Sequence, residues 1–319
     1  MSDQGLKRKY GPVDLGKVRV ALDAFKTEMD GIRGAAEEEL GSISEHILAL
    51  EDILDYAKEP TRFTFSTVRL EDLEKAGVVR KYLFIQSTKV AELAKSLTAN
   101  AEAVVLDLYS RIKKIYSYVN MDHVSGPRMI LDAILLGVAE MASDEQRHVA
   151  ILPGMTIPGE VYISHPTSGY ELCVSGGNLD YAVVEYKNIW DNKARLLTPG
   201  GSDVMRVILT RPNSWLFLVQ AKYQSLDRSF LDYVPEALSQ AIAMLEQANL
   251  QKARFCLSDG QHWLFFILQL ENGTFVYYES ARWYLNRNRV ESSDKELREI
   301  VVLLCEWLRP AANDLFTLQ

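Results

Sequence analysis

The sequence contains little cysteine, and the few cysteines are widely spaced. Three occur in 319 residues, Cys173, Cys256 and Cys305. Because the number is odd and no two lie close together in the sequence, neither a disulfide framework nor a thiolate zinc site is expected. We interpret all three as small buried hydrophobic side chains in a reducing compartment.

Long hydrophobic runs are also missing. No stretch of about 18 apolar residues occurs, so we expect no membrane-spanning helix and no membrane partner. The first residues, MSDQGLKRKYGPVD, contain no apolar segment typical of a secretory signal. These absences favour an intracellular protein, either cytoplasmic or nuclear.

Several familiar catalytic motifs are absent. The sequence contains no GxxxxGK[ST] or GxGxxG loop, no GxSxG elbow and no HExxH zinc motif. The five histidines show no metal-ligand spacing: His46, His123, His148, His165 and His262. The net charge of −8, from 35 basic and 43 acidic residues, opposes non-specific coating of nucleic acid. Any role with nucleic acid therefore needs a local basic patch.

The first part of the chain has helical periodicity. Apolar residues recur at steps of three and four over residues 22–54 and again over residues 90–119. Between these two seams lie Pro60, a β-branched stretch and a short helical piece at about 70–79. The pattern predicts two long helices that fold back as an antiparallel hairpin, which assigns residues 1–126 to a helical region.

The second part changes to an alternating pattern. Residues 120–127 are rich in turn formers, and residues 128–142 then read as a helix. Strand patterns follow at 149–152, 160–164, 179–186, 215–222, 254–258, 262–270 and 274–278. Helices are predicted at 231–248 and 294–308. Residues 127–319 are therefore expected to form a mixed α/β (α+β) domain with a largely antiparallel sheet and helices on its faces.

Two neighbouring predicted strands carry polar residues where apolar ones prevail. Asp180 opens one strand, and Gln220 and Lys222 close the next. If the strands pair as an antiparallel hairpin, the start of the first lies beside the end of the second. Residues two apart share one face of a strand, so Gln220 and Lys222 point the same way. A structural ion pair between Asp180 and Lys222 is one interpretation of this pattern.

A second interpretation comes from a resemblance to the PD-(D/E)xK nuclease superfamily. In that family an Asp is followed, at the end of the next core strand, by an acid and a Lys two residues apart. The resemblance spans about residues 128–270 and includes the segment CLSDGQHWLFFIL. This segment looks like the strand–turn–strand hairpin of uncharacterised nuclease-like proteins, many of them fungal. The resemblance implies a restriction-endonuclease-like fold, a mixed sheet flanked by helices.

The resemblance also implies roles for particular residues. Asp180 and Gln220 would hold Mg²⁺ or Mn²⁺, and Glu140, near the end of the preceding helix, would add a contact to the metal. Lys222 would orient the attacking water and offset charge on the phosphate. Gln240 on the following helix would brace the site or contact the substrate backbone.

Gln220 departs from the family pattern. Most members carry Asp or Glu at this position, whereas some branches, including Mrr-like restriction enzymes, carry Gln. An amide oxygen can coordinate Mg²⁺ but brings no charge. A competing motif, Glu185-Tyr186-Lys187, spells ExK directly. We discount it, because Glu185 and Lys187 face away from Asp180 and lie at the far end of its strand.

One segment of the chain is clearly basic. Residues 187–228 contain seven basic residues against three acidic ones. Either this is a solvated loop, or it faces phosphate groups through Lys193, Arg195, Arg206 and Arg211. A second cluster with the same two interpretations contains Arg282, Arg287 and Arg289.

Two functions remain open from the sequence. The first is Mg²⁺-dependent hydrolysis of phosphodiester bonds in nucleic acid. The second is a catalytically inactive nuclease fold that serves as a scaffold for nucleic acid or protein. In the second case the helical region would bind the partner or form a homodimer, because exposed heptad seams associate with other helices.

Overall fold

The computed structural model describes most of the chain from residue 60 onward. The described residues are 60–165, 168–187, 196–197, 216–222, 229–310 and 315–319, with Val20, Leu22, Asp23, Lys26 and Ile47. The expected first seam, residues 22–54, lies outside the described residues except for those isolated positions. The N-terminal hairpin, and a dimer or partner contact formed through it, therefore stay predictions.

The described residues build one large mixed sheet. Its strands lie in the order β12 (Phe316–Leu318), β2 (Val79–Ile85), β10 (Thr274–Ser280), β9 (His262–Glu271), β8 (Lys252–Ser258), β7 (Leu216–Ala221), β6 (Asn178–Lys187) and β3 (Arg147–Thr156), and β11 (Trp283–Tyr284) pairs with β9. The β7–β8 and β10–β2 pairs are parallel, and the other neighbouring pairs are antiparallel. The sheet is open, with β12 and β3 at its two edges in the described part of the chain. The expected mixed sheet flanked by helices is confirmed at this level.

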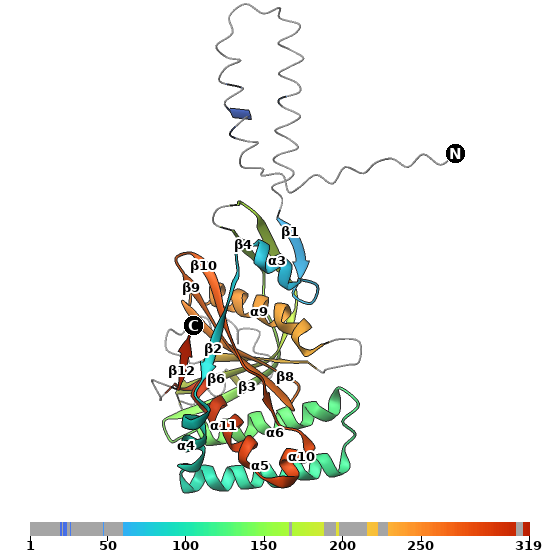
Figure 1. Cartoon of the computed structure of the whole chain (residues 1–319), viewed down its shortest axis with the longest axis vertical. Helices are drawn as coiled ribbons and strands as arrows, with labels where there is room; N and C mark the ends of the chain where they lie inside the picture. Colours follow the sequence, from blue (N-terminus) through green and yellow to red (C-terminus); the bar gives the residue numbers. More distant parts are fainter. Residues whose placement is uncertain are drawn as a thin grey trace, which may run out of the picture.

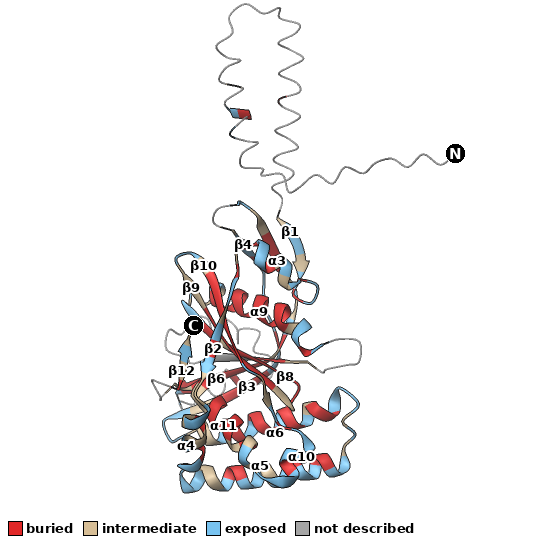
Figure 2. Ribbon diagram, viewed as in Figure 1, coloured by how far each residue is buried: buried red, intermediate tan, exposed pale blue. Residues whose placement is uncertain are grey.

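Helices cover both faces of the sheet (Figure 1). Alternate strand residues point to opposite faces, so that Leu264 of β9 packs toward α9 (Val234–Gln247) and α3 (Leu70–Lys75). Its neighbour Trp263 belongs to the cluster on the other face. That second face is covered by α4 (Ser87–Lys95), α5 (Ala99–Tyr118), α6 (Ser125–Ala142), α10 (Arg287–Ser292) and α11 (Lys295–Leu308). Burial on both faces explains the continuous apolar runs of the central strands, which Figure 2 shows as buried.

A second, smaller sheet lies beside α3. It contains β1 (Thr61–Thr64), β5 (Glu171–Ser175) and β4 (Glu160–Ser164), in that order. Strand β4 coincides with the strand predicted at 160–164, whereas β1 and β5 were not predicted. Val161, Leu172 and Val174 join the core on the α9 face, so this small sheet extends that side of the molecule.

Strand β2 was not predicted. Its residues lie within the part of the chain expected to be helical, yet Val79 pairs with Val276 and Leu83 with Ser280 in a parallel ladder with β10. The large sheet therefore takes strands from both sides of residue 126. The sequence signal is weak because the exposed positions Tyr82 and Phe84 are aromatic rather than polar, and only Leu83 is buried.

The second predicted seam forms two helices rather than one. The helical run breaks between α4 and α5, where the Thr98 side chain accepts a hydrogen bond from the Ala101 N–H at 3.3 Å. This N-cap starts a new helix at Ala99. The seam residues Leu108 and Ile112 of α5 then pack in the core cluster that contains α6, so α5 covers the sheet through α6.

Candidate functional site

Antiparallel pairing of β6 with β7 sets the geometry of the candidate site. Tyr181 lies opposite Val219, so the start of β6 is next to the end of β7. The Asp180 carboxylate reaches across this pairing, and its Oδ2 accepts a hydrogen bond from the Ala221 N–H at 3.0 Å. The structure thereby brings Asp180, Gln220 and Lys222 together where β6 begins and β7 and β8 end. We call this region the site end of the sheet.

Helix α9 adds a carboxylate that the sequence interpretation gave no role. Glu236, in the first turn of α9, is buried against the end of β7. Its Oε1 accepts hydrogen bonds from Gln220 Nε2 at 3.2 Å and from Lys222 Nζ at 2.9 Å. The available signal was the spacing of Glu236 and Gln240, four residues apart on one helix face just after the Lys222 strand.

The pKa of Asp180 is raised, and the causes identify the groups around it. Burial is the largest effect and raises the pKa of this carboxyl, while the charge of Lys222, the Ala221 N–H and the charge of Arg128 lower it. The charge of Glu236 raises it further. Asp180, Lys222, Arg128 and Glu236 are therefore close enough to act as one electrostatic unit.

Arg128 enters the site from α6. Its guanidinium lies 3.3 Å from Asp180 Oδ1, and its Nε donates to the Tyr181 hydroxyl at 3.0 Å. The Tyr181 hydroxyl in turn donates to the Asp132 carboxylate. Burial is the main reason that the pKa of Tyr181 rises to about 12, so this phenol keeps its proton and holds the network together.

Glu140 does not join the site, which corrects the expectation from the sequence. It lies twelve residues after Arg128 on the same helix, a rise of about 18 Å. The carbonyl of Ala142, close to Glu140, accepts a hydrogen bond from Arg309, which also binds Glu185 at the other end of β6. Helix α6 therefore spans the sheet, with its first turns at the site end and Glu140 at the opposite end.

The two glutamines of the site are deeply buried and incompletely paired. Gln220 is 2% exposed and Gln240 is 1% exposed. Gln240 Nε2 donates to the Asn178 carbonyl at 3.2 Å, close to Asp180. The Oε1 atoms of Gln220 and Gln240 have no hydrogen-bond partner among the described residues. Buried acceptors usually have a hydrogen-bond partner, so these two oxygens are uncommon features of the described structure.

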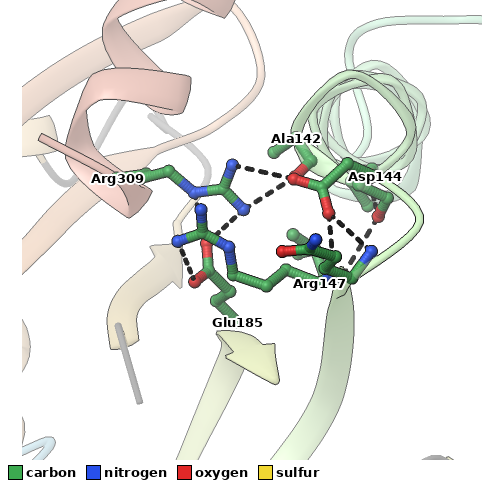
Figure 3. Close-up of polar contacts among 9 residues, drawn as sticks. Ala142, Asp144, Arg147, Glu185 and Arg309 are labelled. Carbon is green, nitrogen blue, oxygen red and sulfur yellow. Dashed lines mark hydrogen bonds and ion pairs between the residues drawn. The ribbon is translucent and has the colours of Figure 1, made fainter. Parts of the chain in front are cut away.

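Glu185 has a structural role at the far end of β6 (Figure 3). Its carboxylate lies between Arg147, at 3.6 Å, and Arg309. Arg309 also contacts Asp144 at 3.5 Å, so four charged side chains tie α11, α6 and β3 to the end of β6. This arrangement separates Glu185 and Lys187 from Asp180, as the strand periodicity indicated.

A small recess opens at the site end of the sheet. It is lined by Val124, Arg128, Leu131, Ala221, Lys222 and Asp259 and has a volume of about 10 Å³. This is about the room that one water molecule needs. A much larger cavity of about 670 Å³ lies elsewhere on the α9 face, where Arg80, Glu279 and Tyr277 are among its lining residues.

The predicted phosphate contacts are only partly described. Lys193, Arg195, Arg206 and Arg211 lie outside the described residues. In the second basic cluster, Arg282 lies over the Phe230 ring at 5.4 Å and Arg289 is paired with Glu296 at 3.4 Å, while Arg287 binds the Tyr116 carbonyl.

The part of the chain that the structure describes contains neither a ready-made metal cluster nor a membrane span. Within the described ranges, no three His, Cys, Asp or Glu side chains form a group that could hold a metal ion. Asp180 and Glu236 are therefore not part of such a three-residue group among the described residues. Of the helices in the same part of the chain, none combines the length and apolar character needed to cross a bilayer.

The candidate site combines two carboxylates, one lysine and two buried amides at one end of a mixed sheet. No protein-family model matches the chain, and a sequence search of curated proteins also finds no match.

Proposed function

We propose that the protein has a restriction-endonuclease-like core of the PD-(D/E)xK superfamily and hydrolyses phosphodiester bonds in nucleic acid with Mg²⁺ or Mn²⁺. One observation carries this proposal. Glu236 of α9 contacts both Gln220 and Lys222, on the strand end that Asp180 also reaches. A carboxylate from the helix thus lies 3.2 Å from the Gln220 amide, and position 220 is the one at which most members of the family carry an acid.

The donor atoms at the site suit a hard divalent cation. Asp180 and Glu236 offer carboxylate oxygens, and Gln220 offers a buried amide oxygen that has no hydrogen-bond partner among the described residues. Oxygen ligands with one or two carboxylates are the set that Mg²⁺ usually takes from a protein, with water completing its coordination. A cation held by these residues would stabilise the negative charge that develops on the phosphate.

The remaining side chains have roles that follow from their contacts. Lys222 carries its ammonium beside Glu236, where it can hold the attacking water and offset phosphate charge. Arg128 supports the ionised form of Asp180 from α6. Gln240 fixes the backbone of Asn178, two residues before Asp180, and so positions the start of β6.

A specific observation favours the alternative, an inactive scaffold. Asp180 is paired with Arg128 and Glu236 with Lys222, so each acid of the site has a basic partner within the chain. A fully compensated network can persist for stability and specificity alone. Under this alternative, nucleic acid or a protein partner binds but no bond is cleaved.

Cleavage assays on the full chain distinguish the two. Labelled single- and double-stranded DNA and RNA are incubated with Mg²⁺ or Mn²⁺ and, in parallel, with chelator. We expect metal-dependent cleavage that Lys222→Ala abolishes and Glu236→Gln lowers by about 10²-fold or more, because each removes a group that acts in the reaction. Glu140→Gln is the matched control and should cleave as wild type does.

The Gln220→Glu variant distinguishes an active enzyme from a protein that has lost its catalytic activity. If the wild type cleaves no nucleic acid and the Gln220→Glu variant does, catalysis has been lost through this one amide. If neither the wild type nor this variant cleaves nucleic acid or binds Mn²⁺, the proposed hydrolysis is wrong and the inactive scaffold is the remaining function.

A further inference from the structure

The β8–β9 hairpin fixes a histidine at the site end of the sheet. A three-residue turn, Asp259 to Gln261, joins the strands, and the Asp259 carboxylate accepts hydrogen bonds from the Gln261 N–H at 2.8 Å and the His262 N–H at 2.6 Å. The other carboxylate oxygen of Asp259 lies 2.8 Å from His262 Nδ1. Because Asp259 is only 5% exposed and holds three contacts, the imidazole has one orientation, with Nε2 directed away from Asp259.

The strand register places this pair in line with Lys222. Ala221 lies beside Ser258 in the parallel β7–β8 pair, and Ser258 lies opposite Trp263 in the β8–β9 hairpin. The next row across the sheet is therefore Lys222, Asp259 and His262. The Lys222 N–H donates to the Ser258 carbonyl at 3.0 Å, and Lys222 and Asp259 line the same recess. Two strand spacings, about 10 Å, separate the Lys222 and His262 backbones.

Lys222 and His262 also share one face of the sheet. His262 has the parity of Leu264, which packs on the α9 face. The short helix η1 (Phe230–Tyr233) confirms this, because its Phe230 ring lies 5.9 Å from the His262 ring and Lys222 Nζ lies 5.7 Å from its Tyr233 ring. The His262 side chain is 26% exposed, so a ligand at the site end can reach it.

We propose that His262 binds a phosphate group of the nucleic acid substrate, with Asp259 as its positioning residue. The inference rests on the proposed function, since it names how that site holds its substrate. In the protonated imidazole both ring nitrogens donate: Nδ1–H to Asp259 and Nε2–H to a phosphate oxygen. Lys222 and His262 then contact the sugar–phosphate backbone at two points on the same face of the sheet. The backbones of these two residues lie about 10 Å apart. Phosphate contacts of this kind fix the register of a strand without reading its bases.

Binding without cleavage tests the proposal directly. Fluorescence anisotropy of a short labelled single-stranded oligonucleotide, DNA or RNA, is measured with the full chain in chelator. We expect His262→Gln to weaken binding roughly tenfold or more, the value of a charge-assisted hydrogen bond. His262→Arg keeps a donating cation and should retain most of the affinity. Thermal unfolding of each variant verifies that it folds.

His148→Gln is the matched control. This histidine is also half-buried beside a tyrosine ring, 6.0 Å from that of Tyr186, but lies at the opposite end of the β3–β6 pair. It should bind as wild type does. Asp259→Asn should weaken binding when residue 262 is histidine and have no effect in the His262→Arg background, which a merely structural aspartate would not show.

The outcomes separate this inference from hydrolysis itself. If wild type binds and His262→Gln binds equally well, the inference is wrong whether or not the protein cleaves. If His262→Gln weakens binding but wild type cleaves nothing, the phosphate site stands and hydrolysis fails. If wild type binds no oligonucleotide and cleaves none, both proposals fail.

Discussion

Asp180 is a mostly buried carboxylate whose negative charge is opposed by burial and supported by two cations. The effect of burial is larger than that of the cations, so the pKa of Asp180 stays raised. A carboxyl of this kind binds a proton more tightly in the folded than in the unfolded chain. Its contribution to stability is therefore present below the ordinary aspartate pKa and is lost as the pH rises through the folded pKa. A bound cation near Asp180 would offset that loss.

The first prediction concerns the pKa of Asp180. Removing the charge of Lys222 with Lys222→Met should raise this pKa further, whereas Glu236→Gln should lower it, because the two charges act on Asp180 with opposite sign. The measurement is a ¹³C NMR titration of the Asp180 carboxyl carbon in each protein. Shifts of the same sign in both variants would contradict the electrostatic unit described for the site.

At the scale of single elements, β6 joins two sites with different roles. Its first residues carry Asp180 at the site end, and its last residues carry Glu185 between Arg147 and Arg309 (Figure 3). The charge cluster of Glu185, Arg147, Arg309 and Asp144 fixes the ends of α6 and α11 on the sheet. The position of Arg128 at the other end of α6 then follows from the rigid length of the helix.

The second prediction tests this charge cluster around Glu185. Arg309→Met should lower the free energy of unfolding by about 1–3 kcal/mol, because Glu185 is only 6% exposed and loses its closest partner. The same substitution at Arg62, whose pair with Glu160 is exposed to solvent, should lower the free energy of unfolding much less. Urea denaturation measures both. Equal losses would mean that burial of Glu185 does not matter.

The third prediction concerns the β8–β9 turn. Gly260 has φ of +90°, and a Cβ there would lie 2.2 Å from the Pro127 carbonyl oxygen of α6. Gly273 has φ of +80° with nothing within 4 Å. Gly273→Ala should therefore cost only backbone strain, about 1–2 kcal/mol. Gly260→Ala should cost about 1–3 kcal/mol more from the overlap.

Thermal unfolding of the two glycine variants gives the comparison. The difference between them isolates the close contact of the hairpin with the start of α6. If both variants melt at the same temperature, the hairpin does not pack on α6 as the structure has it.

Local patterns predicted most elements of the sheet but not all. The strand patterns at 179–186 and 262–270 and the strand–turn–strand segment CLSDGQHWLFFIL correspond to β6, β9 and the β8–β9 hairpin, because each short run carries the pattern of a strand that is buried on one or both faces. Strand β2 was not predicted because its partner β10 lies about two hundred residues later in the sequence and only Leu83 of β2 is buried. Long-range pairing of this kind leaves little trace in a local pattern.

The candidate site was predictable where it depends on strands and not where it depends on helices. Parity and strand order placed Asp180 beside the end of β7. Glu140 was misplaced because a helix sequence does not tell which of its ends meets the site. The positions of Glu236 and His262 at the site could not be predicted from local sequence, because they depend on tertiary packing. Helix α9 and the β8–β9 hairpin bring these two residues toward Lys222.

At the scale of the whole molecule, the site lies where several elements meet. The starts of β6, α6 and α9, the ends of β7 and β8, and the β8–β9 turn converge at the site end of the sheet, and helices cover both faces behind it (Figure 1). Side chains from separate rigid elements are held more precisely than side chains of one loop. This convergence supports a binding or catalytic role more than any single residue does.

The fourth prediction concerns the divalent-cation site that we propose at Asp180 and Glu236. Mn²⁺ binding to the full chain is followed by electron paramagnetic resonance. We expect saturable binding in wild type and in Glu140→Gln, and affinity at least about tenfold weaker in Asp180→Asn and Glu236→Gln, since each removes a charged ligand. An absence of saturable Mn²⁺ binding in wild type, or equal binding in all four proteins, would contradict the account.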